Sequence, residues 1–181
     1  MDIEKNIEDI IKKIEADSLN RLKKTPKRVA LAYDEFFNGY SMCPSKFMES
    51  CFDSEMDDMV ILKNISFESH CEHHLAPIIG YVSIGYIPNK KVIGISKLAR
   101  IVDCFAHRLQ LQERLTMEIA EALQEGINPK GVAVFIEAKH FCLSNRGVKK
   151  QEASLITRYF TGDFRIDEIK RREFLNSIKI S

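Results

Sequence analysis

The sequence of 181 residues has no excess of charge of either sign, no long apolar run and no low-complexity stretch. Its 27 basic and 26 acidic side chains leave a formal net charge of +1, which excludes a general attraction to nucleic acid or to an anionic membrane. Any anionic ligand must therefore be held by a local cluster of cations. No apolar run approaches the roughly 20 residues that span a bilayer, and the charged start, Met1–Lys5, lacks the apolar core of a signal peptide. We expect no membrane partner and no nucleic-acid partner.

Cysteine is also sparse, and it never occurs in a C-x-x-C pair. The five cysteines form an odd number without the pattern of a small secreted domain, which favours a reducing compartment where thiols bind metals or pack in cores. Hydrophobic residues make up 45% of the chain and charged residues 29%, proportions that argue against disorder. A chain of this length forms one domain, or one domain with an extension. We expect a cytoplasmic globular enzyme.

Helical periodicity marks the N-terminal region. Isoleucines between Ile3 and Ile14 recur at helical spacing and predict an amphipathic helix with a charged outer face. Thr25 followed by Pro26 predicts an N-cap and the first position of a second helix, which should end near Asn38. The mixed segment 40–58 predicts a connecting loop.

After residue 58 the pattern changes to strands interrupted by two helices. Alternating residues rich in Ile, Val and Tyr predict the strands, and apolar residues at helical spacing predict the helices. The predicted order is strands 59–67, 78–87 and 92–95, two helices, strands 132–138 and 153–160, and a short C-terminal helix. The first of the two helices has its apolar stripe at Leu98, Ile101, Val102 and Phe105, and the second at Leu111, Leu115, Ile119 and Leu123. This order predicts an α+β domain over residues 59–181, an antiparallel sheet with two helices packed on one face, preceded by an N-terminal helical extension over residues 1–58.

Two short segments concentrate potential metal ligands. Cys71 and His74 are three residues apart, close enough to reach one ion from a tight turn. His140 and Cys142 are two apart, so on a strand they would project from the same face. Zinc prefers thiolates and imidazoles, and three protein ligands leave one position open for water. With His73, the candidate ligands are more numerous than one tetrahedral ion can bind. A catalytic zinc on Cys71, His74 and Cys142, with His73 and His140 free for proton transfer, explains this surplus; a structural zinc or simply buried cysteines are the alternatives.

Cations and one carboxylate suggest a binding site for an anionic purine. Lys97 and Arg100 lie three apart at the start of a predicted helix and so share a face. A solvated helix face is the simpler interpretation, and a phosphate clamp with Arg146 as a third cation is the functional one. The macrodipole favours Glu113 in the first turn of its helix, and its carboxylate could also accept the adjacent N–H donors of guanine. For the other histidines and cysteines we expect packing or surface roles: His70, His107, Cys43, Cys51 and Cys104.

These residues belong to longer segments that resemble the GTP cyclohydrolase I family. The segments are TPKRVA at Thr25–Ala30, CEHH at Cys71–His74, YIPNKKVIGISKLARIV at Tyr86–Val102, RLQLQERLT at Arg108–Thr116 and HFC…RG at His140–Gly147. They cover most of the chain between residues 25 and 147 in the family's order, which is far more specific than any single motif. Two segments differ from the family's usual residues, Leu143–Asn145 and Ser154–Tyr159, the second of which is usually rich in small hydroxyl residues.

The resemblance implies a fold, an assembly and a reaction. The fold is the tunnelling fold, in a homodecamer of two stacked pentameric rings whose sheets join into a barrel and whose active sites lie at subunit interfaces. The reaction converts GTP and water to formate and 7,8-dihydroneopterin triphosphate. By matching position, the resemblance implies that Cys71, His74 and Cys142 bind zinc and that His73 and His140 transfer protons. It implies that Glu113 binds guanine and that Lys97, Arg100 and Arg146 bind the triphosphate. Ser96 would lie near the phosphates and ribose, and Arg28 would reach a neighbour's site.

Three other functions compete with this reaction. A zinc nucleobase deaminase pairs H-x-E with P-C-x-x-C, and this chain has no C-x-x-C. A zinc module that binds a partner protein has no need of Lys97, Arg100 and Arg146 near its metal. A tunnelling-fold zinc protein acting on or binding a different purine or pterin shares Glu113, so only turnover with a panel of nucleotides separates it from the first interpretation.

Overall fold

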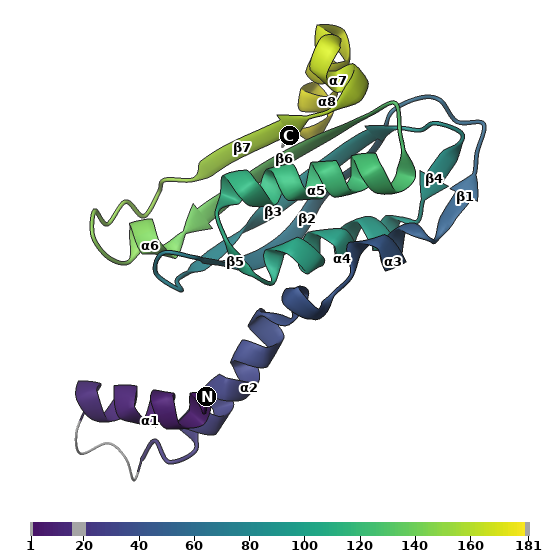
Figure 1. Cartoon of the computed structure of the whole chain (residues 1–181). Helices are drawn as coiled ribbons and strands as arrows, with labels where there is room; N and C mark the ends of the chain where they lie inside the picture. Colours follow the sequence, from purple (N-terminus) through teal and green to yellow (C-terminus); the bar gives the residue numbers. More distant parts are fainter. Residues whose placement is uncertain (1, 16–20, 180–181) are drawn as a thin grey trace.

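A computed structural model describes residues 2–15 and 21–179 of the chain (Figure 1). A largely antiparallel sheet carries two long helices on one face, and the two N-terminal helices project away from it. In chain order the elements are α1 (Ile3–Ile14), α2 (Thr25–Phe36), the 3-10 turn η1 (Asn38–Ser41), α3 (Pro44–Met48), β1 (Cys51–Asp53), β2 (Val60–Cys71), β3 (Pro77–Ile87), β4 (Lys91–Ile93), α4 (Ile95–Ala106), β5 (Leu109–Gln110), α5 (Gln112–Ile127), β6 (Gly131–His140), α6 (Phe141–Ser144), β7 (Leu155–Phe160), α7 (Gly162–Ile166) and α8 (Glu168–Ile178). The order confirms the predicted α+β fold.

The main sheet has five strands in the order β5-β2-β3-β6-β7. As the alternating sequence predicts, β2, β3, β6 and β7 pair with their neighbours in antiparallel fashion. The short strand β5 is different, because it pairs in parallel with the end of β2, His70 with Leu109 and Cys71 with Gln110. It therefore ties the C-terminal end of α4 to the Cys71 segment. A smaller sheet of β1 and β4 lies at the opposite end of the molecule (Figure 1).

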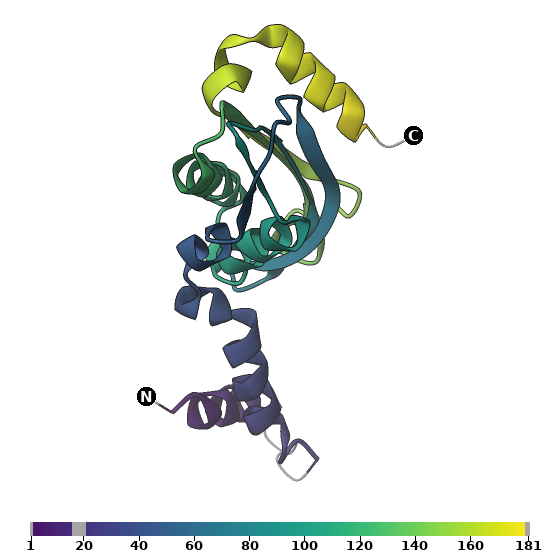
Figure 2. The same ribbon diagram turned by 90° about the vertical axis from the view of Figure 1, so that its right-hand side faces the viewer.

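Helices α4 and α5 cover one face of this sheet (Figures 1 and 2). Their buried apolar residues include Leu98, Ile101, Val102 and Phe105 of α4 and Leu115, Ile119, Leu123 and Ile127 of α5. Leu111, by contrast, precedes α5 in an extended conformation. Alternate side chains of the strands face these helices and complete the core. On the opposite face of the sheet Ile79 and Tyr81 are about half exposed, so that face is open over much of its length.

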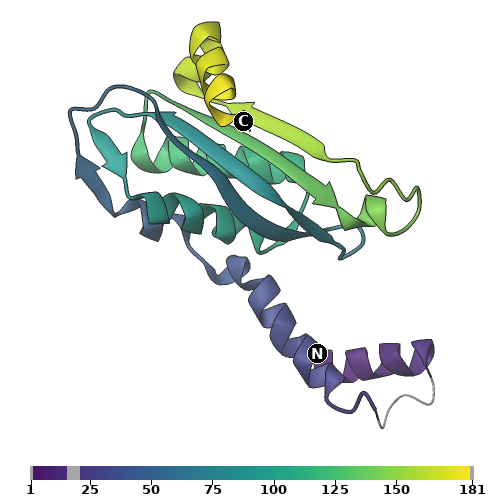
Figure 3. The same ribbon diagram turned by 180° about the vertical axis from the view of Figure 1, so that it is seen from behind.

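The C-terminal helices pack on part of the open face through a second apolar cluster (Figure 3). The ring of Phe174 in α8 lies over Gly85 of β3, where a Cβ atom would come within 2.7 Å of it. Phe174 also meets Phe164 of α7 edge-on, with ring centroids 6.0 Å apart. At the end of α8 the carbonyl of Ser177 accepts a hydrogen bond from Lys63 Nζ of β2 at 3.4 Å. Helix α8 therefore crosses the sheet from the β7 side towards β2.

Replacing Phe174 with alanine tests this attachment. Phe174 is fully buried, and we expect Phe174→Ala to lower the free energy of unfolding by about 3–5 kcal/mol, because the cavity left behind cannot collapse fully. Chemical denaturation followed by circular dichroism measures the change. The matched control is Glu173→Ala on the exposed side of the same helix, which should stay within about 0.5 kcal/mol of the parent. Equal losses in both variants would contradict this account of α8.

Two predictions about the N-terminal region are wrong. Thr25 is the first residue of α2 rather than its N-cap, because Lys24 before it already has a helical backbone and makes no side-chain capping bond. The segment 40–58 is more than a loop, since it contains α3 and β1, and β1 pairs with β4. Elements of five and three residues are too short to show a period, and α3 depends on its contacts with α4 and α5.

Three predicted boundaries near the candidate ligands also change. Strand β2 continues to Cys71, beyond the predicted end at Phe67. Ile95 begins α4 instead of ending the short strand. Strand β6 ends at His140, so Cys142 lies in the helical turn α6 and does not share a strand face with His140. The division of the chain at residue 58 stays a prediction, and residues 1, 16–20 and 180–181 of the two predicted units lie outside the described ranges.

Candidate metal and active site

The turn between β2 and β3 brings Cys71 and His74 together. Cys71 is buried at the end of β2, and its carbonyl accepts hydrogen bonds from the backbone N–H groups of His74 at 3.3 Å and Leu75 at 2.9 Å. Leu75 has a positive φ of 53°, which closes the turn, and Ala76 accepts from the Cys71 N–H at 2.8 Å. As a result Nδ1 of His74 lies 3.8 Å from the sulfur of Cys71.

Cys142 completes a group of three potential ligands. The sulfurs of Cys71 and Cys142 and a ring nitrogen of His74 all lie within 4.8 Å of one another. In tetrahedral zinc sites, bonds of about 2.3 Å to sulfur and about 2.0 Å to nitrogen place the ligand atoms roughly 3.5–4 Å apart. Small side-chain rotations therefore suffice to hold one ion. Two thiolates and one imidazole are also the donor types that zinc prefers.

The chemical state of Cys142 fits a cation at this place. Burial, and then the neighbouring sulfur of Cys71, raise the pKa of the Cys142 thiol above its ordinary value. The Cys142 thiol resists ionisation because its negative charge would lie in a poorly solvated place beside a second sulfur. A divalent cation reverses this balance, since it stabilises both thiolates at once.

A buried glutamine orients His140 beside the three ligands. Oε1 of Gln112 lies 2.8 Å from Nε2 of His140. The amide nitrogen of Gln112 donates to the carbonyls of Ile136 and Leu155 and to the hydroxyl of Thr157, which fixes the amide with its oxygen towards the histidine. Nε2 therefore carries a hydrogen, and Nδ1 is left for other partners.

Two influences act on His140. Burial lowers its pKa below the ordinary histidine value, and the carboxylate of Glu113 opposes that shift. The exposed side chain of Glu113, in the first turn of α5, is thus on the same end of the sheet as His140. Sequence reasoning missed Gln112, because a buried amide has no signature that separates it from a surface one.

An ion pair that sequence reasoning also missed anchors the turn that carries His73. Glu72 accepts from Nη2 of Arg114 at 2.5 Å, and Arg114 also donates to Gln110 Oε1 and to the carbonyl of Leu109, both at 3.0 Å. These bonds tie the turn to β5 and α5. The imidazole of His73 itself is largely exposed, with Nε2 3.9 Å from Glu72.

The predicted phosphate ligands come from separate segments of the chain. Arg146 lies at the metal end, where its Nη1 is 3.0 Å from Nε2 of His74. Ser96, Lys97 and Arg100 lie in the first two turns of α4, whose other end leads into β5 beside Cys71. At about 1.5 Å per residue, the C-terminal end of α4 is roughly 15 Å from Ser96, roughly 14 Å from Lys97 and roughly 9 Å from Arg100 along the helix axis. Arg28 is on α2, outside the sheet domain (Figure 1).

Comparison with known proteins identifies the family of this chain. The family model described as GTP cyclohydrolase I matches residues 3–179. The chain belongs to the GTP cyclohydrolase I family. Two bacterial relatives named GTP cyclohydrolase 1 support the assignment: that of Pelagibacter ubique is 50% identical over 166 residues, 91% of this chain and 82% of its own, and that of Brucella canis is 49% identical over 160 residues, 87% and 75% respectively. The assignment and the order of strands and helices confirm the predicted tunnelling fold.

Solved structures of other proteins resemble parts of the chain. An archaeosine synthase QueF-Like protein in the apo form has a TM-score of 0.48 at 24% identity, covering 57% of this chain and 93% of its own. Escherichia coli dihydroneopterin aldolase in complex with neopterin has a TM-score of 0.43 at 15% identity, covering 58% and 99%.

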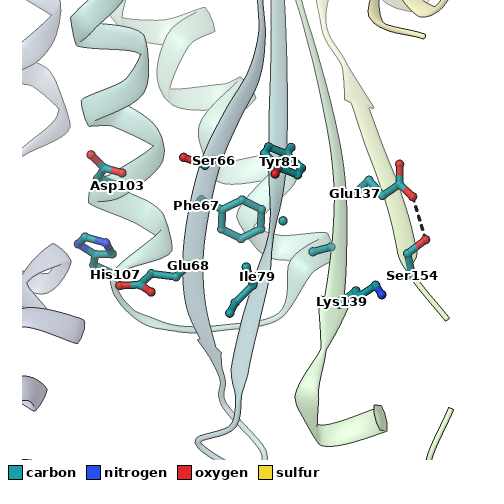
Figure 4. A pocket seen from close by; sticks show the side chains of 12 residues that line it. Ser66, Phe67, Glu68, Ile79, Tyr81, Asp103, His107, Glu137, Lys139 and Ser154 are labelled. Carbon is teal, nitrogen blue, oxygen red and sulfur yellow. Dashed lines mark hydrogen bonds between the residues drawn. The ribbon is translucent and has the colours of Figure 1, made fainter. Parts of the chain in front are cut away.

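The cavity beside the candidate metal ligands is small. It has a volume of about 250 Å³ and is lined by His140, Cys142, Leu143 and residues 153–155. A larger groove of about 640 Å³ lies on the open face of the sheet, with Asp103 and His107 of α4 on one side and Glu137 and Lys139 of β6 on the other (Figure 4). The larger groove is lined by none of the predicted site residues.

Asp103, in the wall of the larger groove, makes a testable contribution to stability. Burial raises its pKa above the ordinary aspartate value, although His107 and Arg100 oppose the shift. A carboxyl with a raised pKa binds more protons in the folded state, so stability falls as pH rises above the unfolded-state pKa. We expect Asp103→Asn to have a larger free energy of unfolding than the parent at pH 7. As pH rises, its free energy of unfolding should fall less than that of the parent. Urea denaturation between pH 4 and 7 measures both, and parallel pH profiles would contradict the prediction.

Proposed function

We propose that this chain catalyses the reaction of its family, in which GTP and water yield formate and 7,8-dihydroneopterin triphosphate. The observation that carries the proposal is the convergence of Cys71, His74 and Cys142, with donor atoms within 4.8 Å of one another, beside an oriented His140. Opening a purine ring needs an activated water and groups that move protons, and this end of the sheet offers residues suited to both. Family membership supplies the substrate.

We assign Cys71, His74 and Cys142 as ligands of a zinc ion. When bound, the ion supplies a water whose pKa is lowered to ~7, a nucleophile for C8 of the purine. Coordination through Nδ1 of His74 requires the ring hydrogen on Nε2, which then cannot accept from Arg146. In that state the present hydrogen bond between Arg146 and Nε2 of His74 would be absent, and the guanidinium of Arg146 would be available to the substrate.

Proton transfer is the role we assign to His140 and His73. His140 is held through Nε2, so its free Nδ1 can carry a proton to the imidazole nitrogen of the purine as water adds to C8. His73 is exposed beside the ligand turn, where it can serve ring opening, release of formate and the later rearrangement of the sugar. Glu113 can accept paired N–H donors from guanine, since its carboxylate is exposed on the side of His140.

The triphosphate site supports an oligomer. Ser96 and Lys97 lie near the start of α4 and Arg100 in its middle, whereas the three proposed metal ligands lie beyond its C-terminal end, so we infer that these residues contact a substrate bound at a neighbouring subunit. The local cavity of about 250 Å³ is also below the range of about 300–1,000 Å³ usual for ligand sites, and a neighbour would supply its missing walls. We propose a homo-oligomer with active sites at subunit interfaces, a decamer in keeping with the resemblance, in which Arg28 also reaches a neighbour's site.

A cytoplasmic location remains part of this proposal. Thiol ligands and five free cysteines suit a reducing compartment. Of the helices in residues 2–15 and 21–179, none is long and apolar enough to cross a membrane.

Metal-loaded protein and GTP provide the direct test. Protein with quantified zinc is mixed with GTP, and formate release and pterin fluorescence are followed together. We expect both products in a ratio near one, and neither after the metal is removed with a chelator. ATP, other purine nucleotides and pterins form the substrate panel. Turnover of another member of this panel but not of GTP would replace the proposed reaction with that of a relative acting on a different purine or pterin.

A further inference from the structure

A groove between β7 and the C-terminal helices is strongly basic. It has a volume of about 710 Å³, and its lining includes five cations and a single carboxylate, that of Glu168. We call this cavity the basic groove, and its five cations are Arg158, Arg165, Arg171, Arg172 and Lys179. Ile166 and Ile169, beside them in the chain, are 84% and 73% exposed, so exposed apolar side chains accompany the cations in sequence.

Little within the chain neutralises the basic groove. Arg172 lies 3.5 Å from Glu168, an exposed pair of small energetic value. Arg171 donates to the backbone carbonyls of Phe164 and Arg165, which leaves its charge unpaired. Arg158 and Lys179 form no ion pair within 4.0 Å in the described part of the chain, although both lie in the pocket lining. A surface with so much unbalanced charge beside exposed isoleucines favours an acidic, partly apolar partner.

An acidic segment of the same chain has the complementary character. Residues 53–58, between β1 and β2, carry four exposed acids, here called the acidic segment: Asp53, Glu55, Asp57 and Asp58. Across residues 2–15 and 21–179, none of the four forms an ion pair within 4.0 Å. Phe52, directly before the segment, and Met56 within it are 61% and 49% exposed. The segment thus pairs negative charge with exposed apolar side chains, as the basic groove pairs positive charge with exposed isoleucines.

The sheet register places the two surfaces at one end of the sheet and at opposite edges. Val60, which follows the acidic segment, pairs with Tyr86, and Ile87 next to it pairs with Gly131. Ala133, two residues further along β6, pairs with Phe160, which precedes α7. The start of β2 and the end of β7 are therefore level with each other, with β3 and β6 between them.

Both outer edges at this end offer unpaired backbone groups. β7 is the last strand of the described sheet, and β5 covers only the final two residues of β2. Since β7 and the first half of β2 run in opposite directions, β7 of one copy can extend the sheet of the next through β2 without a change of direction. Copies arranged edge to edge bring the basic groove of one against the acidic segment of the next.

We propose that the basic groove binds the acidic segment of a second copy of this chain, and that this contact fixes the order of subunits in the assembly. The inference rests on the proposed homo-oligomer and states which charged side chains hold neighbouring subunits together. A free phosphate compound is the rival occupant of five cations. The second copy is favoured because it also accounts for the unpaired acids, the exposed apolar residues on both surfaces and the two open strand edges.

Charge reversal in the basic groove gives the first measurement. We expect Arg165→Glu/Arg172→Glu to raise the concentration at which the parent oligomer dissociates at least about tenfold, because like charges then face each other. Sedimentation velocity over a dilution series measures this. The matched control, Lys13→Glu/Lys23→Glu, has the same change of net charge on exposed residues of the N-terminal region and should dissociate as the parent does. In 1 M NaCl, where the Debye length is about 3 Å, the difference between variant and parent should shrink.

A charge swap guards against a variant that merely folds poorly. Asp57→Lys/Asp58→Lys should weaken assembly alone, and a chain carrying both pairs of substitutions should recover most of the parental assembly. Mixing the two double variants should likewise produce mixed oligomers, because each contact between unlike copies again joins opposite charges, whereas contacts between like copies stay repulsive. Failure of both the combined chain and the mixture to recover assembly overturns the proposal.

The outcomes separate this inference from the proposed function. A parent that releases formate as an oligomer, together with a groove variant of unchanged dissociation concentration, overturns the inference and leaves the function intact. An inactive parent that nevertheless assembles, and that responds to the charge swap, supports the inference while removing the function. A rise in melting temperature with inorganic phosphate or tripolyphosphate that disappears in the groove variant, without any change in dissociation, assigns the groove to a small anion and overturns the inference.

Discussion

Cys142→Ser is expected to lose stoichiometric zinc and to reduce formate release by at least about 10³-fold. Cys142 is one of three donors within 4.8 Å, and the other two alone make a weak site. A metal that activates water contributes several kcal/mol to lowering the barrier, and each 1.36 kcal/mol is a factor of ten. Metal analysis after gel filtration and a formate assay measure the two losses. The hydroxyl of serine is a poor zinc ligand at neutral pH because it stays protonated.

Cys43→Ser is the matched control for this substitution. Cys43 is exposed, and its sulfur lies 3.1 Å from the hydroxyl of Ser45, so its replacement should retain the metal and the rate. Full zinc content and parental turnover in Cys142→Ser would show that the ion, if catalytic, is held elsewhere. Loss of turnover with zinc retained would assign Cys142 a different role.

His140→Ala is expected to lower turnover by about 10²–10⁴-fold while the protein keeps its zinc and its affinity for GTP. That range is typical for removal of one positioned acid or base. The expectation follows from the geometry: His140 is outside the three-ligand group, and Gln112 holds it in one orientation through Nε2. Single-turnover formate release, zinc content and equilibrium binding of GTP distinguish loss of chemistry from loss of the site.

The control for His140→Ala is His107→Ala. His107 lies at the end of α4, where its Nδ1 is 3.1 Å from Oδ1 of Asn38, and we assign it no part in the reaction. It should keep the parental rate. Formate release at the parental rate by His140→Ala, or an equal loss in both variants, would contradict the proton-transfer role of His140.

The sequence determined the elements and the ligand types. Long strands such as β3 and long helices such as α4 carry a period of two or of about 3.6 over ten or more residues, enough to fix type and buried face. The Cys71–His74 and His140–Cys142 segments contained the three candidate metal ligands, which the structure brings within 4.8 Å of one another. The family followed from the same segments.

Tertiary structure decided how these parts meet. Gln112 behind His140, the Glu72–Arg114 pair and the parallel strand β5 have no local signature, because each depends on a partner distant in the sequence. The short elements α3 and β1 form only against other elements, so segment 40–58 had no period to reveal them. Spacing along the chain also gave no warning that Lys97 lies near the start of α4, whereas the three candidate metal ligands lie beyond its C-terminal end. A sequence pattern reports the local period and chemistry of side chains, whereas distances between segments are set by packing of the whole chain.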